Sequence, residues 1–292
     1  MSLAVNRRGL APIPPISEVQ ELDFCFCGVD CADEYTEKAL VSASADEYEN
    51  DKSSFLFRKL VETDAIALEI WKGGVKQADI IDNSFGSYYD SFTSQPLYVG
   101  VVIDWKAVFT AFGYGYYTIR AERTQFGVSV PFTSRNFNVL PYSPELANGT
   151  ARIETFTTGN ILRSEFDYMD LVEGGWYQSI RIKGEFGKKT PTYVSDSLLN
   201  SQRQVLQVQP SIEFDYVLST DFLPQAIRSI IINDQMLNNN MLISDYNLLS
   251  DAIYKQVPLV LEAFEDTSFA GRETGYTIKF KDRVQNQILR NR

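Results

Sequence analysis

The chain has 292 residues, and its 38 acidic side chains outnumber 27 Lys and Arg, which gives a formal net charge of −11. It contains no histidine, which excludes Ser-His and Cys-His catalysis, and it has no basic patch of the kind that binds nucleic acid. Aromatic residues make up 13% of the chain, mostly Tyr and Phe, and such side chains are common both in cores and in protein interfaces.

The first 54 residues predict an extended arm followed by an acidic loop. Residues 1–20 include Pro12, Pro14 and Pro15, and proline fixes φ and restricts the residue before it. We expect this arm to lie on a neighbouring protein. Residues 32–54 are acidic and polar, which predicts a loop or a short helix. Neither a secretory signal nor an apolar run of the ~20 residues needed to cross a bilayer is visible.

Cys25, Cys27 and Cys31 form the one cluster with a metal-like spacing. Together with a nearby Asp they could hold zinc, but zinc sites usually combine two separated half-sites. The alternative is that Cys-x-Cys places two small apolar side chains on one buried face of a strand. We favour the second interpretation and predict no metal and no cofactor. An odd, clustered set of cysteines is no disulfide framework, so a reducing cytoplasm is expected.

From residue 55 onward, alternating apolar and polar residues predict a mainly β protein with a few short helices. A tight hairpin turn is predicted at 72–75, a polar turn at 82–86 and a short helix at 105–112. Thr220 or Asp221 can cap a second helix, although the isoleucines near its end could instead begin a strand. The predicted strands are 55–58, 66–71, 78–81, 98–105, 116–121, 126–130, 150–157, 176–186, 203–209, 213–219, 241–244, 259–264 and 276–280.

These elements predict two β-sandwich-like domains between two terminal segments. After the arm and acidic loop at 1–54 come a first β-rich domain at 55–158 and a second at 159–280. Residues 281–292 mix Arg with Gln and Asn, and we expect them to form a C-terminal docking tail.

The second half of the chain repeats short sequences of the first half in the same order. Residues 117–123, for example, resemble residues 276–283. The segments 55–125 and 215–285 could therefore be a duplicated β-module. Chance similarity between alternating strands is the other interpretation, because the offsets drift whereas true repeats keep a fixed period.

The many carboxylates leave open a pair suited to glycoside hydrolysis, which needs two carboxyl groups about 5–9 Å apart across a cleft. A solvated acidic surface explains the same composition, and we favour it. No other catalytic motif is found in the sequence.

Four segments carry a family resemblance. They are Ser-Ile-Arg-Ile-Lys-Gly at 179–184, Leu-Ser-Thr-Asp-Phe-Leu-Pro at 218–224, Ile-Ser-Asp-Tyr-Asn at 243–247 and Lys-Asp-Arg-Val-Gln-Asn at 281–286. In these phrases the chain resembles virion proteins of tailed phages, especially crAss-like phages that infect Bacteroidetes. The resemblance implies a β-rich neck or tail subunit, of which a ring protein stacked beneath the portal is the nearest type. Such subunits contact the rings above and below through arms and loops.

We therefore expect a non-enzymatic virion structural protein that forms a ring in the head-to-tail connector or tail of a tailed bacteriophage. It would assemble in the host cytoplasm with copies of itself and with portal or other neck and tail proteins. No membrane is involved, and DNA at most passes through a lumen. Pro12, Pro14, Pro15 and Arg283 are the predicted interface residues. The alternative is a carbohydrate- or receptor-binding β-sandwich module of a virion, which would use exposed Trp and Tyr.

Overall fold

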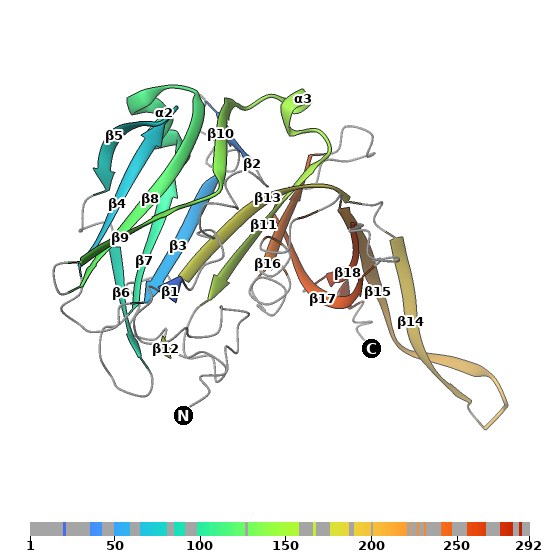
Figure 1. Ribbon diagram of the computed structural model, residues 1–292. Helices are drawn as coiled ribbons and strands as arrows, with labels where there is room; N and C mark the ends of the chain where they lie inside the picture. Colours follow the sequence, from blue (N-terminus) through green and yellow to red (C-terminus); the bar gives the residue numbers. More distant parts are fainter. Residues whose placement is uncertain are drawn as a thin grey trace.

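A computed structural model of the chain shows three β-sheets and few helices (Figure 1), which confirms the predicted fold class. Among the described residues, no helix is both long enough and apolar enough to span a bilayer. The structure describes residues 20–21, 36–42, 50–58, 65–80, 85–90, 98–125, 128–157, 166–167, 176–186, 190–199, 201–220, 223, 227, 231, 241–246, 256–266, 275–282 and 286–287.

Two of the sheets form a sandwich. The first has the strand order β1 (Gln20–Glu21), β3 (Lys52–Arg58), β7 (Tyr98–Asp104), β6 (Phe85–Asp90) and β12 (Phe166–Asp167). The second has the order β2 (Thr36–Val41), β10 (Asn136–Pro141), β8 (Gly115–Gln125), β4 (Ala65–Lys72) and β5 (Val75–Ile80), with β9 (Val128–Thr133) also paired to β8. β2 and β10 run parallel, and the other neighbours are antiparallel.

Aromatic side chains pack the two sheets of the sandwich together. The rings of Phe55 on β3 and Phe137 on β10 meet edge to face with centroids 6.1 Å apart, a favoured aromatic geometry. Trp105 is fully buried with its ring 4.7 Å from that of Phe137. Trp105 opens helix α2 (Trp105–Phe112), which carries the chain from β7 in one sheet to β8 in the other. Asp104 caps the helix by accepting a hydrogen bond from the Lys106 N–H at 2.9 Å.

The third sheet closes on itself as a six-stranded antiparallel barrel. Its strands follow the order β13 (Trp176–Phe186), β11 (Thr150–Thr157), β16 (Met241–Asp245), β17 (Val257–Asp266), β18 (Tyr276–Asp282) and β15 (Val205–Thr220), and β15 then pairs with β13. Short helix α3 (Pro144–Ala147) leads from the sandwich into β11. Apolar side chains from both the barrel and the sandwich belong to one continuous core.

A long hairpin leaves the barrel. β14 (Thr190–Leu199) pairs with the first part of the 16-residue strand β15, and β19 (Asn286–Gln287) touches β15 on its other side. Figure 1 shows this hairpin projecting well beyond the rest of the molecule. The chain reverses at its tip through residues 201–204, where Arg203 has a positive φ of 59°.

Several predicted elements match the structure, and others do not. β11, β13 and α2 have the predicted bounds. The loop or helix predicted at 32–54 is wrong, because β2 lies within it, and the predicted turn at 82–86 is wrong at its end, where β6 has already begun. The two strands predicted at 203–209 and 213–219 are one continuous strand, β15.

The second predicted helix lies largely outside the described residues. Thr220, its predicted cap, ends β15. Leu223, Ile227 and Ile231 are described and buried, four residues apart, and the backbone at Ile227 and Ile231 is helical.

The duplication hypothesis is not supported by strand pairing. β17 and β18 are hydrogen-bonded neighbours, whereas β7 and β8, the corresponding strands of the first half, belong to different sheets. The sequence similarity therefore does not correspond to a repeated sheet. The boundary at residue 158 stays a prediction, but the sheets change earlier, since β11 already pairs with β13 and β16.

Candidate functional site

Two neighbouring strands of the barrel are buried on both faces over residues 151–155 and 178–182. Along β11 and β13, side chains alternate between the barrel interior and the face toward the sandwich. Ile153 and Ile180 lie opposite each other on the first face. Arg152 and Arg181 lie opposite each other on the second face, each at most 2% exposed. Like charges directly opposite each other in a sheet are destabilising, so this pair needs an anion.

Asp51 supplies that anion from the segment before β3. Its Oδ2 accepts hydrogen bonds from Arg181 Nε at 2.7 Å and from the Leu40 N–H at 2.8 Å. Its Oδ1 accepts from Arg181 Nη2 at 2.8 Å and from Arg152 Nη1 at 3.1 Å. One carboxylate therefore bridges both arginines and ties the barrel to the sandwich.

Two further ion pairs extend this buried network. Glu37 on β2 accepts from Arg135 Nε at 2.8 Å and from the Arg181 N–H at 2.9 Å. Glu154 on β11 lies 3.3 Å from Arg152 Nε and accepts from the Tyr177 hydroxyl at 2.9 Å. The network thus holds three arginines and three carboxylates, and its charges balance.

The pKa values of the two central carboxyl groups move in opposite directions. Burial alone would raise the pKa of Asp51, but Arg181 and Arg152 outweigh burial and hold this pKa below its ordinary value. Burial raises the pKa of Glu37 above its ordinary value, and Arg135 offsets only part of the rise. Neither carboxylate lines the described pocket, and both are engaged by arginines, so their role in this arrangement is to join the two halves of the fold.

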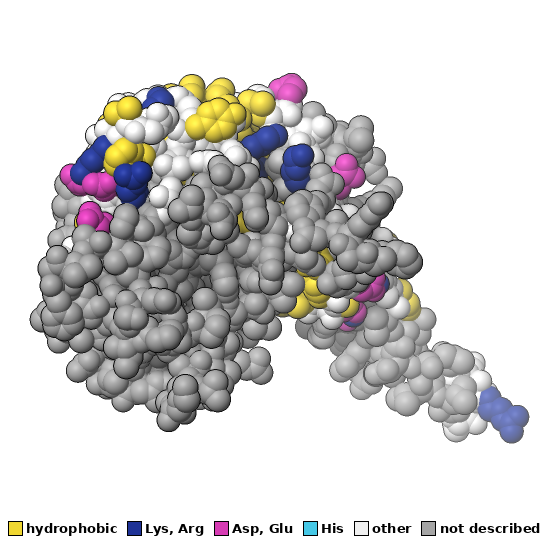
Figure 2. All heavy atoms as spheres, in the orientation of Figure 1, with side chains coloured by type: hydrophobic (Ala, Val, Ile, Leu, Met, Phe, Trp, Pro, Cys, Tyr) yellow, Lys and Arg dark blue, Asp and Glu magenta, His cyan; other side chains and the backbone are white. Residues whose placement is uncertain are grey.

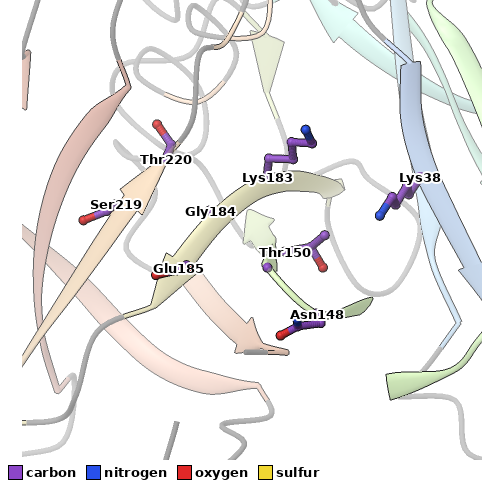
Figure 3. A pocket seen from close by; sticks show the side chains of 9 residues that line it. Lys38, Asn148, Thr150, Lys183, Gly184, Glu185, Ser219 and Thr220 are labelled. Carbon is purple, nitrogen blue, oxygen red and sulfur yellow. The ribbon is translucent and has the colours of Figure 1, made fainter. Parts of the chain in front are cut away.

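An open pocket of about 390 Å³ lies beside the network, where the sandwich meets the barrel (Figure 3). Arg181, Lys183 and Glu185 alternate along β13 onto one face, and this face passes from burial at Arg181 to exposure at Lys183. The pocket lining consists of Lys38 from β2, Asn148, Gly149 and Thr150 from the turn into β11, Lys183, Gly184 and Glu185 from β13, and Ser219 and Thr220 from β15.

Two lysines give the pocket its electrostatic character. Figure 3 shows Lys38 and Lys183 reaching the same space from β2 and β13. Lys38 Nζ donates one hydrogen bond to the Leu146 carbonyl at 3.2 Å. Burial lowers the pKa of Lys38 below its ordinary value, and the nearby positive charges of Lys183 and Arg181 lower it further. Positive charge is therefore concentrated here.

None of the predicted site residues is among those that the structure describes. Cys25, Cys27 and Cys31 lie outside the described residues, as do Pro12, Pro14, Pro15 and Arg283. Their roles stay predictions. In the part of the chain that the structure describes, no group of three or more Cys, Asp or Glu side chains could hold a metal ion.

Sequence reasoning missed both the ion network and the pocket. The strands at 150–157 and 176–186 are predicted from their alternation alone, which does not show that both faces are covered, and the acidic residues are predicted to form a solvated surface. Buried Glu37, Asp51 and Glu154 contradict that assignment. A usable signal was the pair of arginines inside otherwise strong strands.

No protein-family model matches the chain, and no curated protein matches it significantly.

Proposed function

We propose that this protein is a non-enzymatic structural subunit of a tailed-phage virion, which assembles into a ring in the head-to-tail connector or tail. The observation that carries the proposal is the projecting β14–β15 hairpin. An arm of this kind is suited to contact between subunits, and a ring arises when each subunit binds the next through two different surfaces related by rotation.

The hairpin has little support from its own chain. β15 contacts β13 and β18 only from Asp215 onward, and β19 contacts it at Ser211 and Ile212. The remaining stretch, Val205 to Val208, pairs only with β14 among the described residues. An isolated two-stranded hairpin is marginally stable in water, so an ordered hairpin of this length favours a partner that covers it.

The outer edge of β14 offers a second means of contact. Within the described residues β15 is the only strand that pairs with β14, so β14 is an edge strand of the described sheet. Such an edge can accept a strand from another chain. Figure 2 shows the projection ending in a basic side chain, and Arg203 is the basic residue of the exposed tip. On a chain of net charge −11, a basic tip suits the acidic surface of a neighbouring copy.

The carbohydrate- or receptor-binding alternative would need aromatic side chains around a pocket. The described pocket is lined by polar side chains and glycines. The largest aromatic side chains that are fully buried, among them Trp105, Tyr117 and Phe137, serve the core. We therefore keep the assembly function as the proposal.

Light scattering on the purified full-length protein tests the proposal. The key variant replaces residues 195–210 by Asn-Gly, because Val194 and Ser211 are cross-strand partners and a two-residue turn can join them. The matched control is Arg203→Lys, which keeps both the hairpin and the positive charge at its exposed tip. Far-ultraviolet circular dichroism checks that both variants fold.

A large cyclic multimer that dissociates on hairpin replacement, while the Arg203→Lys protein still assembles, would support the proposal. A wild-type protein that stays monomeric and does not co-sediment with portal-containing particles would contradict it. A multimer that survives the replacement would show that the hairpin is not the joint.

A further inference from the structure

We propose that the pocket between β2, the α3–β11 turn and the β13–β15 contact binds a carboxylate carried by an acidic segment of a protein partner. This inference rests on the proposed function for the existence of such a partner. It adds the chemistry of recognition, which the hairpin alone does not specify.

The pocket lining has more positively than negatively charged side chains. Lys38 and Lys183 line it with a single acidic residue, Glu185, so the lining carries one net positive charge. Behind them Arg181 is already neutralised by Asp51. Lys183 forms no ion pair with any described residue, unlike the exposed Lys279, which pairs with Glu265 at 2.7 Å. A bound carboxylate would balance this charge and relieve the repulsion between the two lysines.

The pocket also presents hydrogen-bond donors. Lys38 uses one of its three N–H groups on the Leu146 carbonyl, which leaves two for a ligand. The Thr220 hydroxyl accepts a hydrogen bond from the Tyr276 N–H at 2.8 Å, and its own proton is directed to none of the described residues. Charge-assisted hydrogen bonds from lysine to a carboxylate are stronger than neutral ones.

Size and charge favour a carboxylate on a peptide over a free ion. A bare inorganic ion would leave most of the 390 Å³ empty, whereas pockets of roughly 300 Å³ and above suit a larger organic group. The chain itself carries 38 Asp and Glu residues, so each further copy in an assembly offers acidic segments. An acidic side chain with its neighbouring backbone fits both the volume and the polar lining.

Isothermal titration calorimetry on the full-length protein at low ionic strength tests this inference. The probes are acetyl-Ala-Glu-Glu-Ala-amide, its Gln counterpart acetyl-Ala-Gln-Gln-Ala-amide, and inorganic phosphate. The protein variants are Lys38→Gln, Lys183→Gln and their combination. Lys279→Gln is the matched control, because it removes a surface lysine that does not line the pocket.

We expect the Glu peptide to bind with a dissociation constant on the order of 1 mM, and the Gln peptide to bind about threefold to tenfold more weakly. Lys38→Gln and Lys183→Gln should each weaken binding of the Glu peptide by a similar factor, and Lys279→Gln should not. Added salt should weaken binding of the Glu peptide.

Equal binding of the two peptides, no binding of either, or full binding by the double variant would overturn the inference. Lysine-dependent binding of phosphate without binding of the Glu peptide would also overturn it, because the pocket would then hold a free anion. Lys183 is exposed, so Lys183→Gln keeps the test valid even if Lys38→Gln fails to fold. If the protein is a monomer but its pocket prefers the Glu peptide, the proposed ring is refuted and the pocket inference stands. If the protein forms a ring but its pocket does not distinguish the two peptides, the pocket inference is refuted and the ring stands.

Discussion

Substituting Asp51→Asn should strongly destabilise the fold. The Asp51 carboxylate accepts four hydrogen bonds, from the Leu40 N–H, from Arg181 twice and from Arg152. Both arginine side chains are only 1% exposed. An asparagine of almost the same shape keeps the volume but removes the negative charge, so two opposed arginines would remain in the core without their shared counter-ion.

The expected loss follows from this geometry. Removing one partner of a buried ion pair typically costs about 3–5 kcal/mol, because the remaining charge is buried without compensation. Here one carboxylate serves two arginines, which places the expected loss in the free energy of unfolding toward the upper part of that range. Whole domains are stable by only about 5–15 kcal/mol, so the variant should be close to unfolding at room temperature.

Equilibrium urea unfolding, followed by intrinsic tryptophan fluorescence, measures this loss. Asp79→Asn is the matched control, since it makes the same chemical change at a side chain that is 68% exposed and paired with Lys76 at 2.7 Å. Exposed ion pairs contribute little, so the control should unfold at nearly the wild-type urea concentration. If Asp51→Asn lost less than about 1 kcal/mol, or behaved like the control, the argument that Asp51 holds the two halves together would be refuted.

Three further outcomes are expected. The stability that the Asp51 carboxylate contributes is complete above its ordinary pKa of 3.8 and is lost as pH falls below that value. The cause is that the folded protein holds this pKa lower, so the unfolded chain takes up the proton first. Thermal unfolding of wild type and Asp51→Asn between pH 6 and pH 2 measures this loss, and melting temperatures that change with pH in parallel would refute it. Trp105→Ala should cost about 3–5 kcal/mol in urea unfolding, since this side chain is fully buried, and a loss below half of that would contradict its place in the core. Gly184→Ala should lower the free energy of unfolding by about 1–3 kcal/mol, because an added Cβ would lie 2.9 Å from the Ser219 carbonyl oxygen. A stability equal to that of wild type would show that β13 and β15 are packed less closely than described.

Local sequence patterns were sufficient to predict most strands, and the strands that were predicted wrongly have physical explanations. β2 was missed because Glu37 and Lys38 interrupt its apolar residues, and Glu37 is tolerated in the core only through Arg135, 98 positions away. β15 was divided at Pro210, since proline lacks an N–H for the ladder. The register between β14 and β15 shifts at that point, from Val194 opposite Ser211 to Asp196 opposite Val208, and this irregularity accommodates the proline.

The pocket and the ion network were harder to predict, because they too depend on contacts between residues far apart in the sequence. Lys38, Lys183 and Thr220 meet only because the barrel closes and packs against β2, and no local pattern encodes that meeting. The strand pattern does not show that the face of Arg152 and Arg181 is covered, because their partner Asp51 comes from a segment about 100 or more positions earlier.

The separation of the network's charges along the chain has a consequence for biosynthesis. Asp51 and its partner Arg181 are 130 positions apart, and Glu37 meets the Arg181 N–H across 144. At about 5–20 residues per second, a ribosome needs on the order of ten seconds to deliver the second partner after the first. During that interval the nascent sandwich carries acidic groups in a surface that will later become its core. The Asp51 ion pairs can therefore form only after the barrel strands β11 and β13 have been synthesised.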